Sequence, residues 1–402
     1  MNAPSPRRLD PCPCGSGRRY KDCHGSLGAQ PAAPEPASFT EALALRSRGD
    51  SRAALARIEA GLRNLPGSAP LHNLRGLLLQ DLMELDQAAA AFDASLGIAP
   101  QLVEAHVNRG LLLLLRGDYA RGFDEYAWRT RAPGYADYAN FPFGMPRWEG
   151  ETLSGRSILV HAEQGQGDTI QFARFLAPLA RDGATIDFFC HPPLASLLAR
   201  VEGVRRATSE LRERPAHDYH ASILDVAQAH LRVAGAARWL GPYLDALPAR
   251  LDRFGDLAAA PGPRIGIAWK GSPLHGNDRN RSLARDAARR LVSGGATFVN
   301  LQIGEAPLEA SMLDVAPRIR DWDDTAAILA RLDLLVTVDT AVAHLAGAMG
   351  RRVLLLLPFS PDWRWGTEGD TTAWYPDMRL VRQPRAGDWL PAIESAIARY
   401  PA

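Results

Sequence analysis

A cluster of metal-binding residue types lies near the N-terminus, where Cys12, Cys14, Cys23 and His24 fall close together. Three thiolates and one imidazole are the ligand set of a closed tetrahedral zinc site. The glycines after Cys14 allow a tight turn, and a bound metal can replace the hydrophobic core that so short a segment cannot build. We therefore expect these four side chains to bind a structural Zn2+, with reactive or incidental thiols as the alternative.

A loop with a single aspartate follows a short apolar run. It reads Glu-Gln-Gly-Gln-Gly-Asp-Thr at residues 163–169. It is not a dinucleotide-binding fingerprint, because the third glycine of that motif would fall at Ile170. Open α/β sheets place ligands at the carboxyl ends of their strands, so Gly165, Gly167 and Asp168 are candidate site residues. Asp168 is either a general base or, more simply, a cap of the following helix.

A second candidate loop carries cations. An apolar run ends at Lys270, and the polar loop after it contains Asn277, Arg279 and Arg281. Lys21 and Lys270 are the only lysines of the chain, in which 44 of the 46 basic residues are arginine. A compact ammonium differs from a planar guanidinium where one phosphate oxygen must be met in a confined space, so a retained lysine favours a functional role for Lys270.

A third loop joins an apolar run to a helical pattern through Asp339 and Thr340, and His344 follows one turn later. Helix N-termini bind phosphate through their free N–H groups, so these three residues are candidates for a phosphate site. The alternative is structural, with Asp339 as a helix cap and His344 packed inside. Gln302 and Asp324, on other loops of the same region, are weaker candidates for contacts to a nucleoside.

Short apolar or β-branched runs predict the strands that carry these loops, at 157–161, 185–190, 264–269, 297–302, 334–338 and 353–357. Segments with helical periodicity lie between several of them, at 169–181, 325–330 and 341–349. Continuous apolar strands that alternate with helices indicate parallel sheets covered on both faces. A proline-rich stretch divides the region, so we expect two Rossmann-like domains that face a cleft.

Residues 39–131 have a helical pattern that repeats every 34 residues. The residues that recur at this spacing are Ala42, Gly76 and Gly110; Ala54, Ala88 and Gly122; Ile58, Phe92 and Tyr126; and Pro66 and Pro100. Small residues let two helices approach, a large residue fills the gap and a proline ends the second helix. The period and residue types resemble those of tetratricopeptide repeats, with a generic helical bundle as the alternative.

The predicted organisation is multidomain. A zinc-binding segment (1–26) and a Pro/Ala linker (27–38) precede three helical repeats (39–132), an aromatic connector (133–155) and two α/β domains (156–255 and 256–402). The fold class is therefore a small zinc knuckle, an all-α array and an α/β region.

Composition excludes several classes of protein. The 46 basic and 45 acidic residues leave a net charge of +1, so the chain lacks the large excess of positive charge that a broad nucleic-acid-binding surface needs. The 46% of hydrophobic residues rules out disorder as the main state. The longest apolar runs have five residues, far short of the roughly 20 that cross a bilayer. No secretory signal is readable, and we expect a cytoplasmic protein.

Two resemblances refine this picture. The run Cys-Pro-Cys-Gly-Ser-Gly-Arg-Arg-Tyr-Lys-Asp-Cys-His-Gly at 12–25 closely resembles the SEC-C motif, a zinc-binding segment that implies docking to another macromolecule.

The candidate site residues of the α/β region resemble those of heptosyltransferase-like glycosyltransferases of the GT-B fold. Gly167-Asp168 is similar to the loop that carries their proposed base, Lys270 to a lysine of their nucleotide half, and Asp339-Thr340 with His344 to their Asp-Thr-Gly-x-x-His diphosphate motif, in which Ala341 replaces glycine. Bacterial proteins that join tetratricopeptide repeats to such a domain also share the runs at 277–282 and 361–365.

The expected function is that of a metal-independent, inverting glycosyltransferase acting from a nucleotide-diphosphate sugar. Asp168 would take the proton from an acceptor hydroxyl. Lys270, Arg279, Arg281, Thr340 and a helix N-terminus would stabilise the departing diphosphate. The repeats would present a polypeptide acceptor and be separable from catalysis. A scaffold with a degenerate transferase domain is the alternative, and contact of the Arg-rich zinc segment with RNA is a third.

Overall fold

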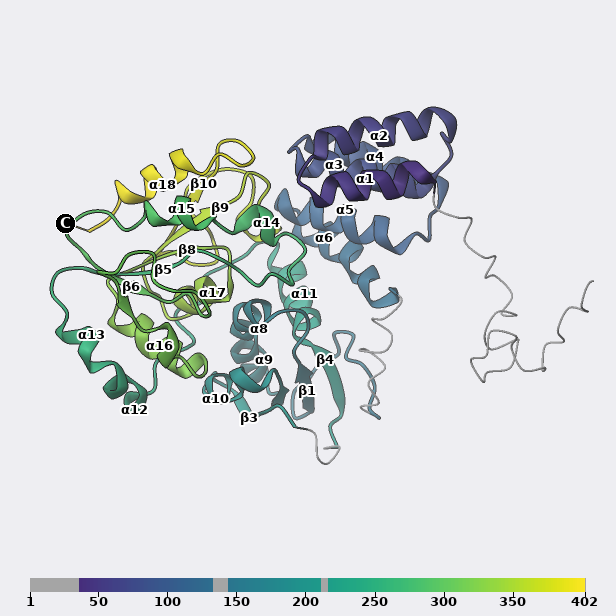
Figure 1. Ribbon diagram of the computed structural model, residues 1–402. Coiled ribbons are helices and arrows are strands. Elements are labelled where there is room, and N and C mark those ends of the chain that lie inside the picture. The colour runs from purple at the N-terminus through teal and green to yellow at the C-terminus, as the bar shows by residue number, and fades with distance from the viewer. Residues whose placement is uncertain (1–35, 133–143, 211–215, 402) are drawn as a thin grey trace, which may run out of the picture.

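The computed structural model describes residues 36–132, 144–210 and 216–401. Figure 1 shows a helical array beside two β-sheets. The predicted zinc ligands Cys12, Cys14, Cys23 and His24 lie outside the described residues.

Six helices in consecutive pairs form the array. They are α1 (Ala37–Ser47), α2 (Ser51–Asn64), α3 (Ala69–Asp81), α4 (Leu85–Ile98), α5 (Val103–Leu115) and α6 (Tyr119–Tyr126), followed by the 3-10 helix η2 (Ala127–Arg131). The helix α1 begins directly after Pro36, so the end of the predicted linker is helical. Asp50 and Asp118 cap α2 and α6 by accepting hydrogen bonds from backbone N–H groups.

Equivalent contacts recur along the array at the predicted period. The ring Nε2 of His72 lies 2.9 Å from the carbonyl oxygen of Pro66, and that of His106 lies 2.9 Å from the carbonyl oxygen of Pro100. Gly76 packs so closely on the Phe92 ring that a Cβ would overlap it. The helical N-terminal region fits the sequence pattern, and the assignment to tetratricopeptide repeats stays a prediction.

The first sheet is parallel and has the order β3-β2-β1-β4. Its strands are β1 (Ser157–His161), β2 (Thr185–Phe189), β3 (Val204–Thr208) and β4 (Tyr219–Ser222). Its helices are α8 (Gln166–Phe172), η3 (Ala173–Phe175), α9 (Leu176–Arg181), η4 (Pro192–Leu194), α10 (Ala195–Leu198) and α11 (Ile223–Ala234). The short helices α12 (Pro248–Leu251), η5 (Asp252–Phe254) and α13 (Gly255–Ala259) lead to the second sheet.

The second sheet is also parallel and has the order β10-β9-β8-β5-β6-β7. Its strands are β5 (Arg264–Ala268), β6 (Thr297–Asn300), β7 (Leu313–Asp314), β8 (Leu334–Val338), β9 (Val353–Leu357) and β10 (Met378–Arg382). Its helices are α14 (Asp278–Arg281), α15 (Arg285–Arg289), η6 (Ala316–Arg318), α16 (Trp322–Arg331), α17 (Ala341–Ala348), η7 (Trp363–Trp365) and α18 (Leu390–Ile397). The strand order reverses between β5 and β8, and such a switch point is where open sheets bind ligands.

All six predicted strands are present within two residues of their expected ends, so the prediction of parallel α/β sheets is confirmed. Four further strands escaped prediction. β3 and β10 carry exposed arginines, β4 contains a histidine, and β7 has only two residues. These strands are the outermost ones of their sheets, where a continuous apolar run is not required.

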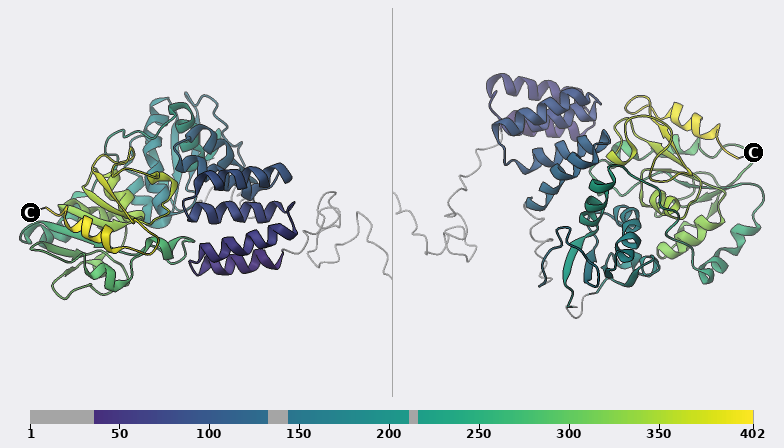
Figure 2. Two further views of the ribbon diagram at one scale, coloured as in Figure 1. Left: turned by 90° about the horizontal axis from the view of Figure 1, so that it is seen from above. Right: turned by 180° about the vertical axis from the view of Figure 1, so that it is seen from behind.

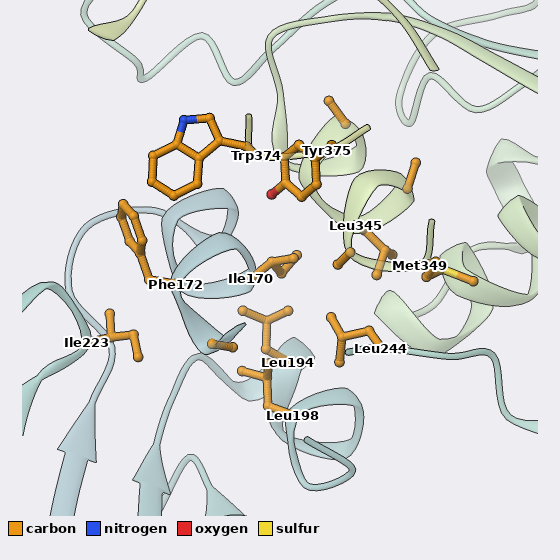
Figure 3. Packing of buried hydrophobic residues seen from close by; sticks show 14 of the residues in the cluster. Ile170, Phe172, Leu194, Leu198, Ile223, Leu244, Leu345, Met349, Trp374 and Tyr375 are labelled. Atoms are coloured by element: carbon orange, nitrogen blue, oxygen red, sulfur yellow. The ribbon is translucent and has the colours of Figure 1, made fainter. Parts of the chain in front are cut away.

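The two sheets share a hydrophobic core. Figure 3 shows Ile170 and Leu194 of the first half facing Leu345 on α17 and Met349 just after that helix, with Tyr375 above them. Leu115 and Phe123 of the array belong to the same buried cluster. In the views of Figure 2 the array lies beside the sheets, and its last pair packs on them, with α6 against α11 and α5 against η7. The array is therefore not a separate body. Within the described residues, no helix combines the length and apolar character needed to cross a bilayer.

Candidate functional site

A pocket of about 700 Å³ opens where the carboxyl ends of strands from both sheets face each other. The predicted site residues that line it are Gly165, Gly167, Asp168, Lys270, Arg281, Gln302, Asp339, Thr340 and His344. They come from the ends of β1, β5, β6 and β8 and from the segments that follow these strands. Loops after four strands therefore meet in one pocket, at the strand ends where open α/β sheets bind ligands.

Asp168 stands in the first turn of α8, where it does two things. Its Oδ2 accepts a 2.9 Å hydrogen bond from the N–H of Gly165, so the carboxylate closes the start of the helix. Its Oδ1 accepts a hydrogen bond from the guanidinium of Arg364. The N-cap of α8 is Gly165 and not Asp168, which is the third residue of the helix and caps it by binding the N–H of Gly165. Asp168 also faces the pocket.

Arg364 was not among the predicted site residues. It lies in η7, its side chain is 8% exposed, and it also donates to Oδ1 of Asp362 at 2.8 Å. The neighbouring carboxylates hold the pKa of Arg364 above its ordinary value although burial opposes this. Its segment, Pro-Asp-Trp-Arg-Trp, had stood out only as a shared run. The sequence signal that could have identified it is an arginine flanked by two tryptophans. Both tryptophans are buried, so the arginine between them is also drawn into the interior.

Lys270 follows β5, and both its side chain and its backbone N–H donate hydrogen bonds. Its Nζ donates to Oε1 of Glu305 at 2.5 Å, and this ammonium lowers the pKa of Glu305. Its backbone N–H and that of Trp269 both donate to the side-chain oxygen of Gln302, at 2.9 and 3.0 Å. Gln302 therefore shapes the end of β5, a structural role that the nucleoside assignment did not foresee. A ligand anion at Lys270 would compete with Glu305.

Arg281 reaches the pocket from α14. Its Nη1 donates to the backbone oxygen of Asp339 at 2.8 Å, which ties the cationic loop to the end of β8. Gly271 permits this, because a Cβ there would overlap the Arg281 guanidinium and the Asp278 carboxylate. Burial, and next the charge of Asp362, raise the pKa of Asp339 to about 6.

The helix α17 starts at the pocket with Thr340 as its N-cap. Gly167 on α8 lies against it, and a Cβ on Gly167 would be 3.2 Å from Cδ2 of His344 and 3.3 Å from Cα of Ala341. His344 accepts or donates a 3.0 Å hydrogen bond through Nδ1 with the Tyr375 hydroxyl. Burial holds the pKa of His344 well below its ordinary value. His344 thus packs inside, as the structural alternative supposed, while still lining the pocket.

Three predicted site residues do not line the pocket. The side-chain oxygen of Asn277 accepts from Asn280 within its own loop. Arg279 turns away and lines a second cavity, of about 310 Å³, with residues of α2 and α3. Asp324 is wrong as a nucleoside contact, because its carboxylate is fully buried in ion pairs with Arg250 and Arg253.

Several pocket residues were not foreseen. His191, after β2, and His275, on the cationic loop, line the pocket, as does Trp322, whose ring N–H donates to the side chain of Gln166. Burial lowers the pKa of His275. Over residues 36–132, 144–210 and 216–401, no three His, Cys, Asp or Glu side chains form a group that could hold a metal ion.

Two segments of the chain match models of known protein families. Residues 10–26 match the SEC-C motif, and residues 302–374 match glycosyltransferase family 9 (heptosyltransferase). Protein FlbA of Caulobacter vibrioides (strain ATCC 19089 / CIP 103742 / CB 15) is 28% identical over 412 residues, which span 92% of this chain and 67% of that protein.

Two solved bacterial structures align with part of the chain. A glycosyl transferase family 9 protein from Veillonella parvula DSM 2008 aligns with a TM-score of 0.43 and 11% identity, over 63% of this chain and 92% of that one. The E. coli heptosyltransferase WaaC with ADP-2-deoxy-2-fluoro heptose aligns with a TM-score of 0.41 and 13% identity, over 60% and 99%. The segment that matches family 9 carries Asp339, Thr340, His344 and Arg364 of the pocket. The match supports a glycosyltransferase.

Proposed function

We propose that the chain transfers a sugar from a nucleotide-diphosphate sugar to an acceptor hydroxyl in the pocket between the two sheets. The observation that carries the proposal is the meeting of Asp168 from one half with Lys270, Arg281 and the start of α17 from the other. A carboxylate opposite a group of cations and helix N–H donors fits a reaction that removes a proton on one side and releases an anion on the other.

On the donor side, the diphosphate would lie between Lys270, Arg281 and the first turn of α17. Lys270 and Arg281 supply positive charge, and Thr340 adds a hydroxyl beside the helix N-terminus. These groups can balance the charge that develops on the departing diphosphate, so the proposal needs no catalytic metal. A diphosphate would displace Glu305 from Lys270.

On the acceptor side, Asp168 would accept the proton as the hydroxyl attacks the anomeric carbon. Each oxygen of Asp168 accepts one of the hydrogen bonds described above, and a carboxylate has about four lone-pair sites in all. Asp168 can therefore still receive an acceptor hydroxyl while Gly165 and Arg364 hold its orientation. Attack from the face opposite the leaving diphosphate would invert the anomeric centre.

The flanking parts would serve recruitment. We assign Zn2+ to Cys12, Cys14, Cys23 and His24 on the ligand set, and the matched SEC-C motif is consistent with this. We also assign the array as three tetratricopeptide repeats, because equivalent contacts recur every 34 residues. A concave helical array suits an extended polypeptide acceptor.

A non-catalytic scaffold with a degenerate transferase domain is the second candidate. The observation that favours it is Ala341, whose side chain occupies the start of α17 where a glycine would let a phosphate approach more closely. Its packing against Gly167 leaves little room to move away.

A screen of nucleotide sugars tests the two candidates against each other. The purified full chain is incubated with sugars of ADP, GDP and UDP, and release of the nucleotide and thermal stabilisation are measured. The transferase predicts stabilisation by one nucleotide class together with slow hydrolysis of its sugar. Stabilisation with no release, even when a polypeptide acceptor is supplied, favours the scaffold.

A further inference from the structure

The last helix pair of the array contacts the loop that carries Asp168. Tyr126 ends α6, and its hydroxyl accepts a hydrogen bond from the side-chain amide of Gln164, the residue before Gly165. Three residues later, Arg129 donates to Glu163 through two parallel hydrogen bonds, Nε to Oε1 at 2.8 Å and Nη2 to Oε2 at 3.0 Å. Two consecutive side chains of the loop are therefore held from the array.

The pair of Arg129 and Glu163 lies inside the protein. The side chains are 7% and 5% exposed, and Nη2 of Arg129 also donates to Asp225 of α11 at 3.0 Å. Two carboxylates thus share one buried guanidinium. Removal of one partner from such a group leaves an uncompensated buried charge, so the contact constrains where the loop can lie.

The backbone of the loop needs such support. Gln164 has a φ of +66°, a left-handed conformation that is uncommon for residues other than glycine. It persists in folded proteins where the surroundings fix it. Here the side chains on each side of this peptide unit, Glu163 and Gln164, are both bound to the array.

The array also supports the other member of the Asp168–Arg364 pair. The rings of Tyr119 and Phe123 on α6 meet the ring of Trp363 edge to face, with centroids 6.2 and 5.9 Å apart. Trp363 precedes Arg364 in η7. One helix of the array therefore contacts the loops on both sides of the pair.

We infer that the third helix pair and the 3-10 helix η2 after it are part of the catalytic unit, with Tyr126 and Arg129 as positioning residues that act through Gln164 and Glu163 on Asp168. This inference rests on the proposed function, because it assumes that Asp168 acts on substrate. It replaces the expectation that the array can be removed without loss of catalysis. A chain lacking the array would lose the Arg129 partner of Glu163 and the Tyr119 and Phe123 contacts of Trp363.

The experiment compares two loop-contact variants with a matched control. Tyr126→Phe removes one hydroxyl, and Arg129→Lys keeps the charge but loses the paired geometry. The control, Arg46→Gln, breaks a paired contact with Asp81 between α1 and α3 that has similar lengths, 2.7 and 3.0 Å, and lies away from the loop. Amide hydrogen exchange of residues 163–168, thermal unfolding, nucleotide-sugar turnover and ADP, GDP and UDP binding are measured for each full-length variant.

Both loop-contact variants should speed exchange of the 163–168 amides, and their kcat should fall by roughly 10- to 100-fold with KM for the donor and nucleotide binding nearly unchanged. The control should change thermal stability alone. If Arg129→Lys does not fold, Tyr126→Phe decides the question by itself. Exchange and kcat equal to those of the control overturn the inference, and so does faster exchange with an unchanged kcat. A parent chain that turns over no nucleotide sugar overturns the proposed function instead, and the exchange data then show separately whether the array holds the loop.

Discussion

The guanidinium of Arg364 donates to the carboxylate of Asp168 across 196 residues of sequence. This contact joins the half of the chain that carries the proposed base to the half that carries the proposed phosphate site. The base is thus oriented by a residue of the opposite domain, while Asp362 holds the same arginine at 2.8 Å. The separation of the two halves and the direction of the Asp168 carboxylate are consequently coupled.

Lys270 should control nucleotide affinity. Lys270→Ala removes a cation that meets the diphosphate, so binding of the best nucleoside diphosphate should weaken by roughly 10- to 100-fold in a calorimetric titration. Lys270→Arg should restore only part of it, because the planar guanidinium does not fit where the ammonium does. Glu305→Gln should tighten binding, since Glu305 is the competing anion. Unchanged affinity of Lys270→Ala would contradict this role.

Gly271 should act through Arg281. A methyl group at position 271 would overlap the tips of Arg281 and Asp278, and Arg281 is long enough to swing away and lose its contact with Asp339. Gly271→Ala should therefore fold with a stability loss of roughly 1–3 kcal/mol, yet weaken nucleotide binding as much as Arg281→Gln. The double variant should bind no more weakly than either single variant, because both remove the same interaction. Gly276→Ala, where a Cβ meets nothing within 4 Å, is the control, and equal losses there would refute the prediction.

Asp339 should make stability depend on pH. Its pKa of about 6 in the folded protein, raised mainly by burial, exceeds the value near 3.9 of an unfolded chain. Between about pH 4 and pH 6 the folded state therefore binds more protons, so this group lowers stability as pH rises through that window and adds no change above it. Asp339→Asn removes the effect. Urea unfolding from pH 4 to pH 8 should show the parent losing roughly 1–3 kcal/mol relative to the variant as pH rises, whereas parallel curves would exclude the assignment.

Zinc should be present in equimolar amount and depend on the N-terminal cysteines. Metal analysis of protein treated with a chelating resin should find one zinc per chain, and Cys12→Ser combined with Cys14→Ser should abolish it because two of four ligands are lost. Nucleotide binding in the α/β region should remain. Stoichiometric zinc in the double variant would place the metal elsewhere.

Much of the fold followed from the sequence because buried strands and repeats carry local signals. The run Val-Leu-Leu-Leu-Leu at β9 is apolar throughout and is buried throughout. At β10, by contrast, Arg379 interrupts the apolar residues and Arg382 ends them, and this strand is the outermost one of its sheet. Whether a strand lies at the edge depends on the order of all the strands in the sheet, so a local sequence pattern cannot predict it.

Part of the site could also be predicted from local sequence signals. Asp168 and Lys270 stand at strand ends, so their common location follows from parallel topology. The role of Arg364 depends on a partner 196 residues away. Asp324 was instead expected in the site although it lies outside the pocket. From the sequence, an aspartate after a strand can contact a ligand, but here Arg250 and Arg253, more than 70 residues earlier, bind its carboxylate. Pairings at such distances arise from tertiary packing alone.

Turnover by Asp168→Asn tests the central claim most directly. Asparagine keeps the shape and can still accept the N–H of Gly165, but it cannot take a proton from an acceptor hydroxyl. With the best donor from the nucleotide-sugar screen, the variant should bind the donor about as tightly as the parent, within roughly threefold, while its turnover falls by roughly two to four orders of magnitude. Full turnover by Asp168→Asn would contradict the account.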